Sequence, residues 1–471
     1  MTELATANFI VPAAFNPVAG GPVEAVRGFW HWLVATRALL IGAFAVLLVA
    51  VGALAAAGFG SYRYYGATVK LIGINSGPSI VASSKMRSLL ADASASTILA
   101  GLSAGSSRDL FLQQSAEAME QVRGNLISAA LNITYGQDER APLFQLMGAL
   151  SDYERRVSVA QATNGAAGVA RLQEAAHFLQ ERVLPHVDEL EQVNLRNLRS
   201  AYALHAESAK ARSTTLLGSG LALLGLLVLT QLLLVQRFRR MLSVPLLGAA
   251  AVVSAYLVLM LGLTGSIDKD LRLASQESFE KIHDLAGVKS AAFAARISQA
   301  EYVISNGSQS SDKAFFNAYE MAIGSGLRAP RPFPYQIGPV ASSLKTSILT
   351  LSVGKPPALE EGEPRSLRAR QAWERFMALN TQVVTAQSTG QHEAAVASTI
   401  GDAPNQAGWA FDQFIAALDN VIYFHQNAFD DAITRAAQSL QYFPWLVGAT
   451  LSMALLLLVL AFRPRLAEFR F

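Results

Sequence analysis

Four windows of the chain hold apolar residues without a single charge, whereas apolar and charged residues alternate with a helical period elsewhere. The uncharged windows are 38–59, 213–235, 245–265 and 443–462. Each is about 20 residues long, which is enough for a helix to cross a hydrocarbon core of about 30 Å. A helix buried in a soluble domain seldom stays uncharged for that length. The pattern therefore predicts four membrane-spanning helices.

Composition agrees with this interpretation. The chain is 52% hydrophobic and 15% charged, against a charged share of about 25% in soluble domains, and its mean hydropathy is +0.30. It contains no cysteine, which excludes disulfides, iron–sulfur clusters and thiolate zinc sites.

The short segments beside the predicted spans carry an excess of basic residues. Eight of the 38 basic and three of the 35 acidic residues lie there, which leaves 30 and 32 to the two long segments, 60–212 and 266–442. Short basic flanks stay in the cytoplasm, whereas long segments cross largely regardless of charge. We therefore expect a protein of the bacterial plasma membrane, with segments 1–37, 236–244 and 463–471 inside and both long segments outside.

A cleaved signal peptide is the alternative for the first window, because residues 53–55 resemble a cleavage site. The apolar run is longer than the stretch of about 7–15 residues typical of such a peptide. Loss of this span would leave the topology of the rest unchanged.

The first long segment has the pattern of a helical bundle. Apolar residues recur at i, i+3, i+4 and i+7 in 89–102, 107–133, 143–162 and 168–213. Turn-forming residues interrupt the period at Gly105, Gly136 and Asn164–Gly165. Four helices, each with one apolar stripe, bury those stripes by packing against one another, so an up-and-down bundle is predicted. Within the last helix, Pro185 should end or kink the helix.

The second long segment repeats this scheme. Residues 300–311 resemble 95–111, and residues 385–391 resemble 159–165. The paired spans and these similarities favour a tandem duplication of span, bundle and span. A proline-rich insertion at 328–365, with a short hairpin in it, distinguishes the second copy. It is either a solvated loop or a docking element for a partner.

The chain carries no motif that indicates catalysis or transport. A phosphate-binding loop, a nucleophile elbow and a kinase signature are absent, and the seven histidines form no HExxH pair. The spans have no Asp, Glu, Lys, Arg or His in their middles, so a proton or ion pathway lacks its usual parts. The predicted inner segments are too short for a catalytic or nucleic-acid-binding domain. We expect no enzyme, no cofactor, no metal site and no nucleic-acid partner.

Two groups of arginines face the cytoplasm in this topology. They bind anionic lipid headgroups of the bilayer or dock a cytoplasmic partner. Their members are Arg237, Arg239 and Arg240 in the loop and Arg463, Arg465 and Arg470 in the tail.

Several stretches resemble the GlnX-like family of actinobacterial four-span membrane proteins. They are LLADASAS, DYERRVSVAQATNG, GVARLQEAAHFLQERVLPHVDEL and the ending RPRLAEFRF. The resemblance implies a relay from an extracytoplasmic glutamine-binding lipoprotein to a cytosolic serine/threonine kinase, PknG. The family's first-bundle motif is kept at residues 91–96, whereas its second-bundle motif is reduced to SQAEYVI at 298–304, without the acidic pair.

The candidate contacts for a ligand or partner follow from these motifs. Asp92 stands in a run of small and apolar residues, with Arg87 five positions earlier. A buried carboxylate is costly without a partner, so such a residue is exposed, capped or part of a site. The candidates are Arg87, Asp92, Ser94, Ser96, Glu301 and Tyr302.

Three functions fit this organisation. The first is a non-enzymatic sensor that relays an extracytoplasmic amino acid, or a loaded solute-binding protein, to a cytosolic partner such as a kinase. The second is a structural or accessory subunit of a larger membrane complex or homo-oligomer. The third is a chemoreceptor-like protein that binds its ligand directly, without a binding protein.

Overall fold

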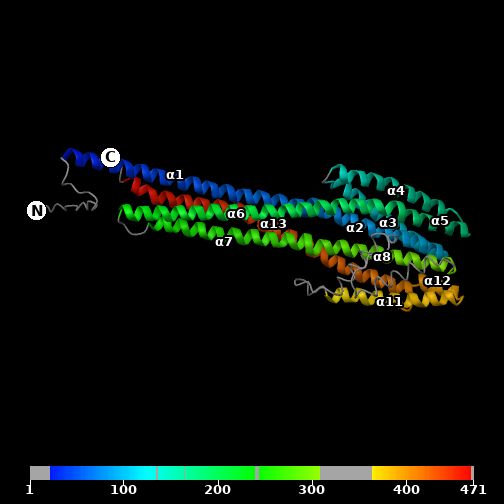
Figure 1. Ribbon diagram of the computed structural model, residues 1–471. Coiled ribbons are helices and arrows are strands. Elements are labelled where there is room, and N and C mark those ends of the chain that lie inside the picture. The colour runs from blue at the N-terminus through cyan, green and yellow to red at the C-terminus, as the bar shows by residue number, and fades with distance from the viewer. Residues whose placement is uncertain (1–21, 134–135, 164, 239–242, 308–362, 468–471) are drawn as a thin grey trace, which may run out of the picture. The chain divides into compact units, whose positions relative to one another are not determined.

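The computed structural model describes residues 22–133, 136–163, 165–238, 243–307 and 363–467, and these are almost entirely helical (Figure 1). No strand occurs within these ranges. The α-helices are α1 (Pro22–Val69), α2 (Gly77–Leu102), α3 (Gly105–Leu131), α4 (Gln137–Gln161), α5 (Gly165–Phe178), α6 (Leu184–Phe238), α7 (Val244–Arg272), α8 (Phe279–Ile304), α11 (Glu363–Ser388), α12 (His392–Ile400) and α13 (Ala407–Ala467). The π-helical segments are η1 (Lys70–Ser76), η2 (Leu179–Val183) and η3 (Leu273–Ser278).

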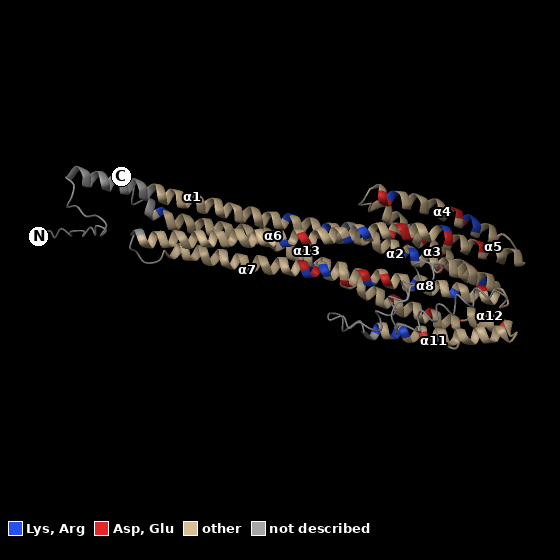
Figure 2. Cartoon of the chain, in the orientation of Figure 1, with Lys and Arg blue, Asp and Glu red and all other residues tan. Residues whose placement is uncertain are grey.

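The predicted class, an all-α membrane protein, is confirmed. In the described part of the chain, four helical runs are long and apolar enough to cross a membrane, and they contain the four predicted windows. Their apolar stretches in α1, α6, α7 and α13 carry almost no charged residues (Figure 2). Most of the N-terminal segment, and the proline-rich insertion with its predicted hairpin up to residue 362, lie outside the described residues.

Contacts divide the chain into two compact units. We call residues 1–64, 209–264 and 440–471 the membrane unit, and residues 65–208 and 265–439 the bundle unit. The bundle unit contains helices from both predicted outer segments. The two sets of helices therefore pack within one body.

Small residues let the helices of the membrane unit approach closely, as is usual between spans. A Cβ atom on Gly58 of α1 would collide with the Tyr256 hydroxyl of α7. In the same way, Gly220 of α6 leaves room for Leu257 of α7. Glycine thus occurs where α1 and α6 each contact α7 closely.

One hydrophobic core of the bundle unit lies among the helices of the first outer segment. α2, α3, α4 and the α5–η2–α6 run each contribute buried side chains to it. Leu90 of α2, Val122 of α3 and Leu146 of α4 are fully buried there. This arrangement agrees with the predicted first bundle.

A second core joins α2 to the helices of the second outer segment. Ala95 and Ile98 of α2 pack with side chains of α8, α11, α12 and α13. Trp373 and Phe376 of α11 supply the large rings of this core, and both are buried. α2 therefore belongs to both cores at once.

The expectation that each outer helix has one apolar stripe is wrong for α2. Nineteen of its 26 residues are buried, and many of them are alanines and serines. Small side chains let other helices approach from all sides, so a helix of this composition lies at the centre instead of at the rim. α8 is equally buried, with 19 of 26 residues, and it packs against α2.

The predicted breaks between helices are confirmed at three glycines. Gly105, Gly136 and Gly165 have φ values of 56°, 70° and 69°. Glycine adopts this left-handed backbone without the steric cost that a Cβ atom imposes. Local sequence therefore determines where these helices end.

Pro185 does not end its helix. Helical structure continues from Gly165 to Gln236, and the widened η2 segment ends at Val183, two residues before the proline. A proline lacks an N–H group and clashes with the carbonyl four residues earlier, which here is that of Glu181. A π-helical turn absorbs this misfit.

Comparable π-helical segments precede the two central helices. η1 leads from α1 into α2, and η3 leads from α7 into α8. α2 and α8 are both 26 residues long. This correspondence is consistent with the tandem duplication, which stays a prediction.

Gly73 of η1 gives a test of this packing. A Cβ atom on Gly73 would collide with Cγ2 of Ile433 in α13, and the branched Ile433 side chain has few other rotamers. We expect Gly73→Ala to lower the free energy of unfolding by about 1–3 kcal/mol, measured by chemical denaturation of the full chain in detergent. Gly66→Ala is the matched control, because nothing lies within 4 Å of its Cβ position, and it should stabilise α1 slightly. Equal effects of the two substitutions would contradict the close contact at Gly73.

Candidate functional site

A polar network ties three helices of the bundle unit together. Arg87 comes from α2, Asp188 and Glu191 come from α6, and His283 comes from α8. We call these four residues, with Ser84 of α2, the polar junction. The helices α2, α6 and α8 belong to three different helical runs, and each run contains one candidate span.

Glu191 is the centre of the polar junction. Ser84 donates a hydrogen bond of 2.5 Å to Oε1 of Glu191, and Nδ1 of His283 lies 2.7 Å from the same oxygen. The other carboxylate oxygen faces Arg87 at 3.3 Å. The Glu191 side chain is only 2% exposed, so its charge depends on these partners.

Arg87 bridges both carboxylates of α6. Its second terminal nitrogen lies 2.7 Å from Oδ1 of Asp188. Residues 188 and 191 stand on one face of α6 because positions three apart in a helix are neighbours. The junction holds equal numbers of positive and negative charges when His283 is protonated.

Burial and charge shift the pKa values of the junction in different directions. Burial raises the pKa of Asp188 to about 6, although Arg87 beside it acts in the opposite sense. Burial also acts to raise the pKa of Glu191, but His283 and Arg87 outweigh it and hold that pKa below its usual value. Burial disfavours the His283 cation, yet the hydrogen bond to Glu191 raises its pKa. Glu191 therefore stays ionised under mildly acidic conditions in which Asp188 takes up a proton.

Asp92 lies apart from Arg87, which pairs with α6 instead. Burial raises the pKa of Asp92 to about 6, against the effects of Lys289 and of the Ser96 hydroxyl. Ser96 Oγ lies 3.5 Å from Oδ1 of Asp92, while Lys289 of α8 forms its close pair, at 2.7 Å, with Asp419 of α13. Asp92 is thus a partly buried carboxyl at the contact of α2 with α8.

The other predicted residues occupy different places. Ser94 is fully buried in α2. Oε1 of Glu301, near the end of α8, lies 3.2 Å from Nε2 of His177 in α5, and Tyr302 beside it is buried. The structure therefore brings Asp92 and Ser96 together but distributes the six candidates over several sites.

The predicted cytoplasmic arginines are described only in part. Arg463 is exposed near the end of α13. Arg239, Arg240 and Arg470 lie outside the described residues, and the side chains of Arg237 and Arg465 are not described.

Sequence reasoning missed Asp188, Glu191 and His283. A signal was present, because two of the three acidic residues of VLPHVDELEQV, Asp188 and Glu191, fall beside the apolar positions of their helix. Their partners lie about 90 to 110 positions away, and no local pattern connects such positions. Among the described residues, the polar junction included, no group of three or more His, Asp or Glu side chains is placed to hold a metal ion.

The first outer segment is similar to a known family. Residues 68–203 match the family model described as "Actinobacterial sensor domain". The match begins at the end of α1 and includes Arg87, Asp188 and Glu191 of the polar junction. It supports a sensing role. Comparisons with curated proteins and with solved structures gave no match.

Proposed function

We propose that this protein is a non-enzymatic transmembrane sensor that relays an extracytoplasmic signal to a cytosolic partner. The observation that carries the proposal is the position of the sensor-like segment. The first and last helices of residues 68–203 belong to unbroken helical runs that are long and apolar enough to span a membrane. A displacement of these helices would therefore be transmitted along the helices to the apolar runs.

The polar junction is the element that couples the helices in this proposal. Glu191 holds Arg87 of α2 and His283 of α8 to α6. Packed helices switch between discrete arrangements by shifts of about 1–2 Å. A ligand that favours one arrangement changes the population of both. The junction would hold one arrangement through short, charge-assisted contacts.

The signal in this proposal is an amino acid, either free or carried by a solute-binding lipoprotein. The output partner is a cytosolic protein such as a serine/threonine kinase. It would contact the basic loop and the tail, which face the cytoplasm in the topology expected from the flanking arginines. Arg463 is exposed, as such a contact requires.

The proposal predicts that three tail arginines are needed for output. Single surface contacts are each worth about 0–1 kcal/mol, so Arg463, Arg465 and Arg470 are changed to glutamine together. We expect the triple variant to lose its response, measured as capture of the kinase with and without glutamine or aspartate outside. Labelling of an added Ser106→Cys thiol by an impermeant reagent, in intact cells, checks that the chain still inserts with this segment outside.

A matched variant removes three exposed arginines from the bundle unit instead. Arg171, Arg196 and Arg368 are changed to glutamine, so the loss of charge is the same. This variant should respond as the unmodified protein does. An intact response in the correctly inserted tail variant would remove the tail from the mechanism. A protein without response to any amino acid would favour the accessory-subunit function.

A further inference from the structure

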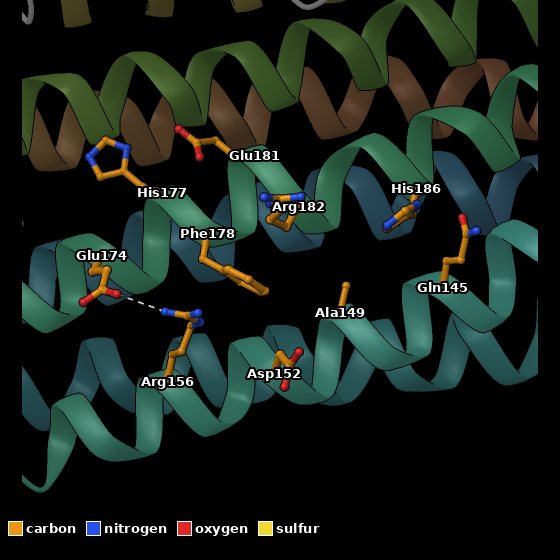
Figure 3. Close-up of a pocket in the computed structure, with 10 residues that line it drawn as sticks. All are labelled: Gln145, Ala149, Asp152, Arg156, Glu174, His177, Phe178, Glu181, Arg182 and His186. Carbon is orange, nitrogen blue, oxygen red and sulfur yellow. Dashed lines mark hydrogen bonds and ion pairs between the residues drawn. The ribbon is translucent and has the colours of Figure 1, made fainter.

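A groove runs along the first set of helices, between α4 and the α5–η2–α6 run (Figure 3). Its volume is about 630 Å³. The ring of Phe178 and the small side chain of Ala149 line its middle. Arg182 of η2 and Asp152 of α4 lie on opposite walls, with these two apolar side chains between them. Oδ1 of Asp152 already accepts a hydrogen bond of 2.7 Å from Arg155, so a ligand would meet its other carboxylate oxygen. The groove thus presents opposite charges across an apolar floor.

Arg156 is held in a fixed position at one end of this groove. Its guanidinium lies 4.3 Å from the centre of the Phe178 ring and 3.0 Å from Oε1 of Glu174. Within the described part of the chain, its buried Nε has no hydrogen-bond partner. A guanidinium that is already oriented loses little side-chain entropy when it binds a ligand.

Arg182 is placed differently from Arg156. It is exposed, and across the described ranges no carboxylate pairs with it. It belongs to η2, the widened segment that ends two residues before Pro185. π-helical turns occur frequently at functional sites because they change the direction of the side chains on them. Here the turn brings Arg182 to the wall of the groove.

The titratable groups that line the groove carry both signs. They are the carboxylates of Asp152, Glu174 and Glu181, the guanidiniums of Arg156 and Arg182, and the imidazoles of His177 and His186. Glu174 pairs with Arg156, and His186 stands at the far end beside Gln145. A surface of this kind does not favour a simple anion or a simple cation. It suits a molecule that carries both charges a short distance apart.

We propose that this groove binds a small zwitterionic solute. Its carboxylate would face Arg182, its cationic nitrogen would face Asp152, and its carbon chain would lie over Phe178 and Ala149. Arginine suits a carboxylate because its planar fork matches the two oxygens. Binding here would give the sensor a direct ligand site. The role of the groove in sensing rests on the proposed function, whereas the binding of a zwitterion to the groove does not.

The test is calorimetric titration of the purified full chain in detergent. The probes are L-glutamine and glycine betaine, which carry both charges, and succinate and putrescine, which carry only one kind. We expect the zwitterions to bind and the other two to bind at least about tenfold more weakly, since one charged contact is lost. Arg182→Gln and Asp152→Asn should each weaken zwitterion binding by about tenfold or more.

Exposed residues outside the groove provide matched controls. Arg171→Gln on α5 and Asp109→Asn on α3 remove the same charges and should leave binding unchanged. Unaltered binding in both groove variants would refute the site. Equal binding of succinate or putrescine would refute the ligand class, and so would failure of both zwitterions at millimolar concentration. No cytosolic partner takes part in this measurement, so a failure of the relay would not affect its result.

Discussion

Replacing Glu191 with alanine is expected to lower the free energy of unfolding by about 3–5 kcal/mol, because the change leaves buried charges without a partner. Arg87 loses one of its two carboxylates, and His283 and Ser84 lose the oxygen that they share. The Glu191 side chain is 2% exposed, so water cannot replace it without local opening. Urea denaturation of the full chain in detergent measures the loss.

The neighbouring residue Glu189 provides the control. Its side chain is 56% exposed on the same helix, and Nδ1 of His186 lies 4.0 Å from its Oε2. Glu189→Ala should therefore change stability by no more than about 0.5 kcal/mol. If Glu191→Ala cost as little as this control, the polar junction would contribute nothing to the packing of α2, α6 and α8.

The second large effect concerns pH and Asp188. The pKa of Asp188 is about 6 in the folded chain, compared with an ordinary value of 3.8 for an aspartate. The folded state therefore binds a proton that the unfolded state does not bind between these pH values. Stability rises as the pH falls through 6, because protonation removes the cost of burying the charge. Between pH 7.5 and 4.5 this contribution amounts to about 2 kcal/mol.

Other groups in the bundle unit also make stability depend on pH, and they act in both directions. Asp92, with a pKa of about 6, adds to the rise on acidification. The raised pKa of His283 acts in the same direction. The stability that His283 contributes is fully present below its pKa in the unfolded chain and is lost as the pH rises through its pKa in the folded chain. Glu191 acts oppositely, since its lowered pKa gives stability that is lost at lower pH. The lowered pKa of His425, about 4 through burial and Lys281, also reduces stability on acidification.

Comparison of variants isolates the contribution of Asp188. Asp188→Asn removes the titrating group while keeping its size, so the variant should gain about 2 kcal/mol less than the unmodified protein between pH 7.5 and 4.5. Glu189→Gln, on the exposed side of the helix, should follow the unmodified protein. Parallel pH profiles for Asp188→Asn and the unmodified protein would show that Asp188 does not take up the proton.

The two effects have a common consequence for signalling. The contacts that hold α2, α6 and α8 together also respond to the proton concentration around the bundle unit. In the proposed topology that unit faces outward, so extracytoplasmic acidity would change the strength of the coupling between helices. Variants of Glu191 and Asp188 should therefore alter both the stability and the relay.

The sequence by itself determined the features that depend on neighbouring residues. Uncharged windows of about 20 residues predict spans because the hydrocarbon core sets that length. Gly105, Gly136 and Gly165 mark helix ends because the left-handed backbone at each of them favours glycine. The helical period also predicted the α-helical class. Each of these conclusions follows from the residue types in one short stretch.

Other features were decided only by the tertiary structure. The burial of α2 on nearly all sides results from two cores that meet along it. Arg87 pairs with Asp188 and Glu191 because α6 places both carboxylates against α2. His283 joins them from α8. Asp92 is nearer to Arg87 in sequence but is not its partner. Contacts across about 90 to 110 positions depend on how the helices pack, and helical periodicity gives the apolar face of a helix but not the neighbour that covers it.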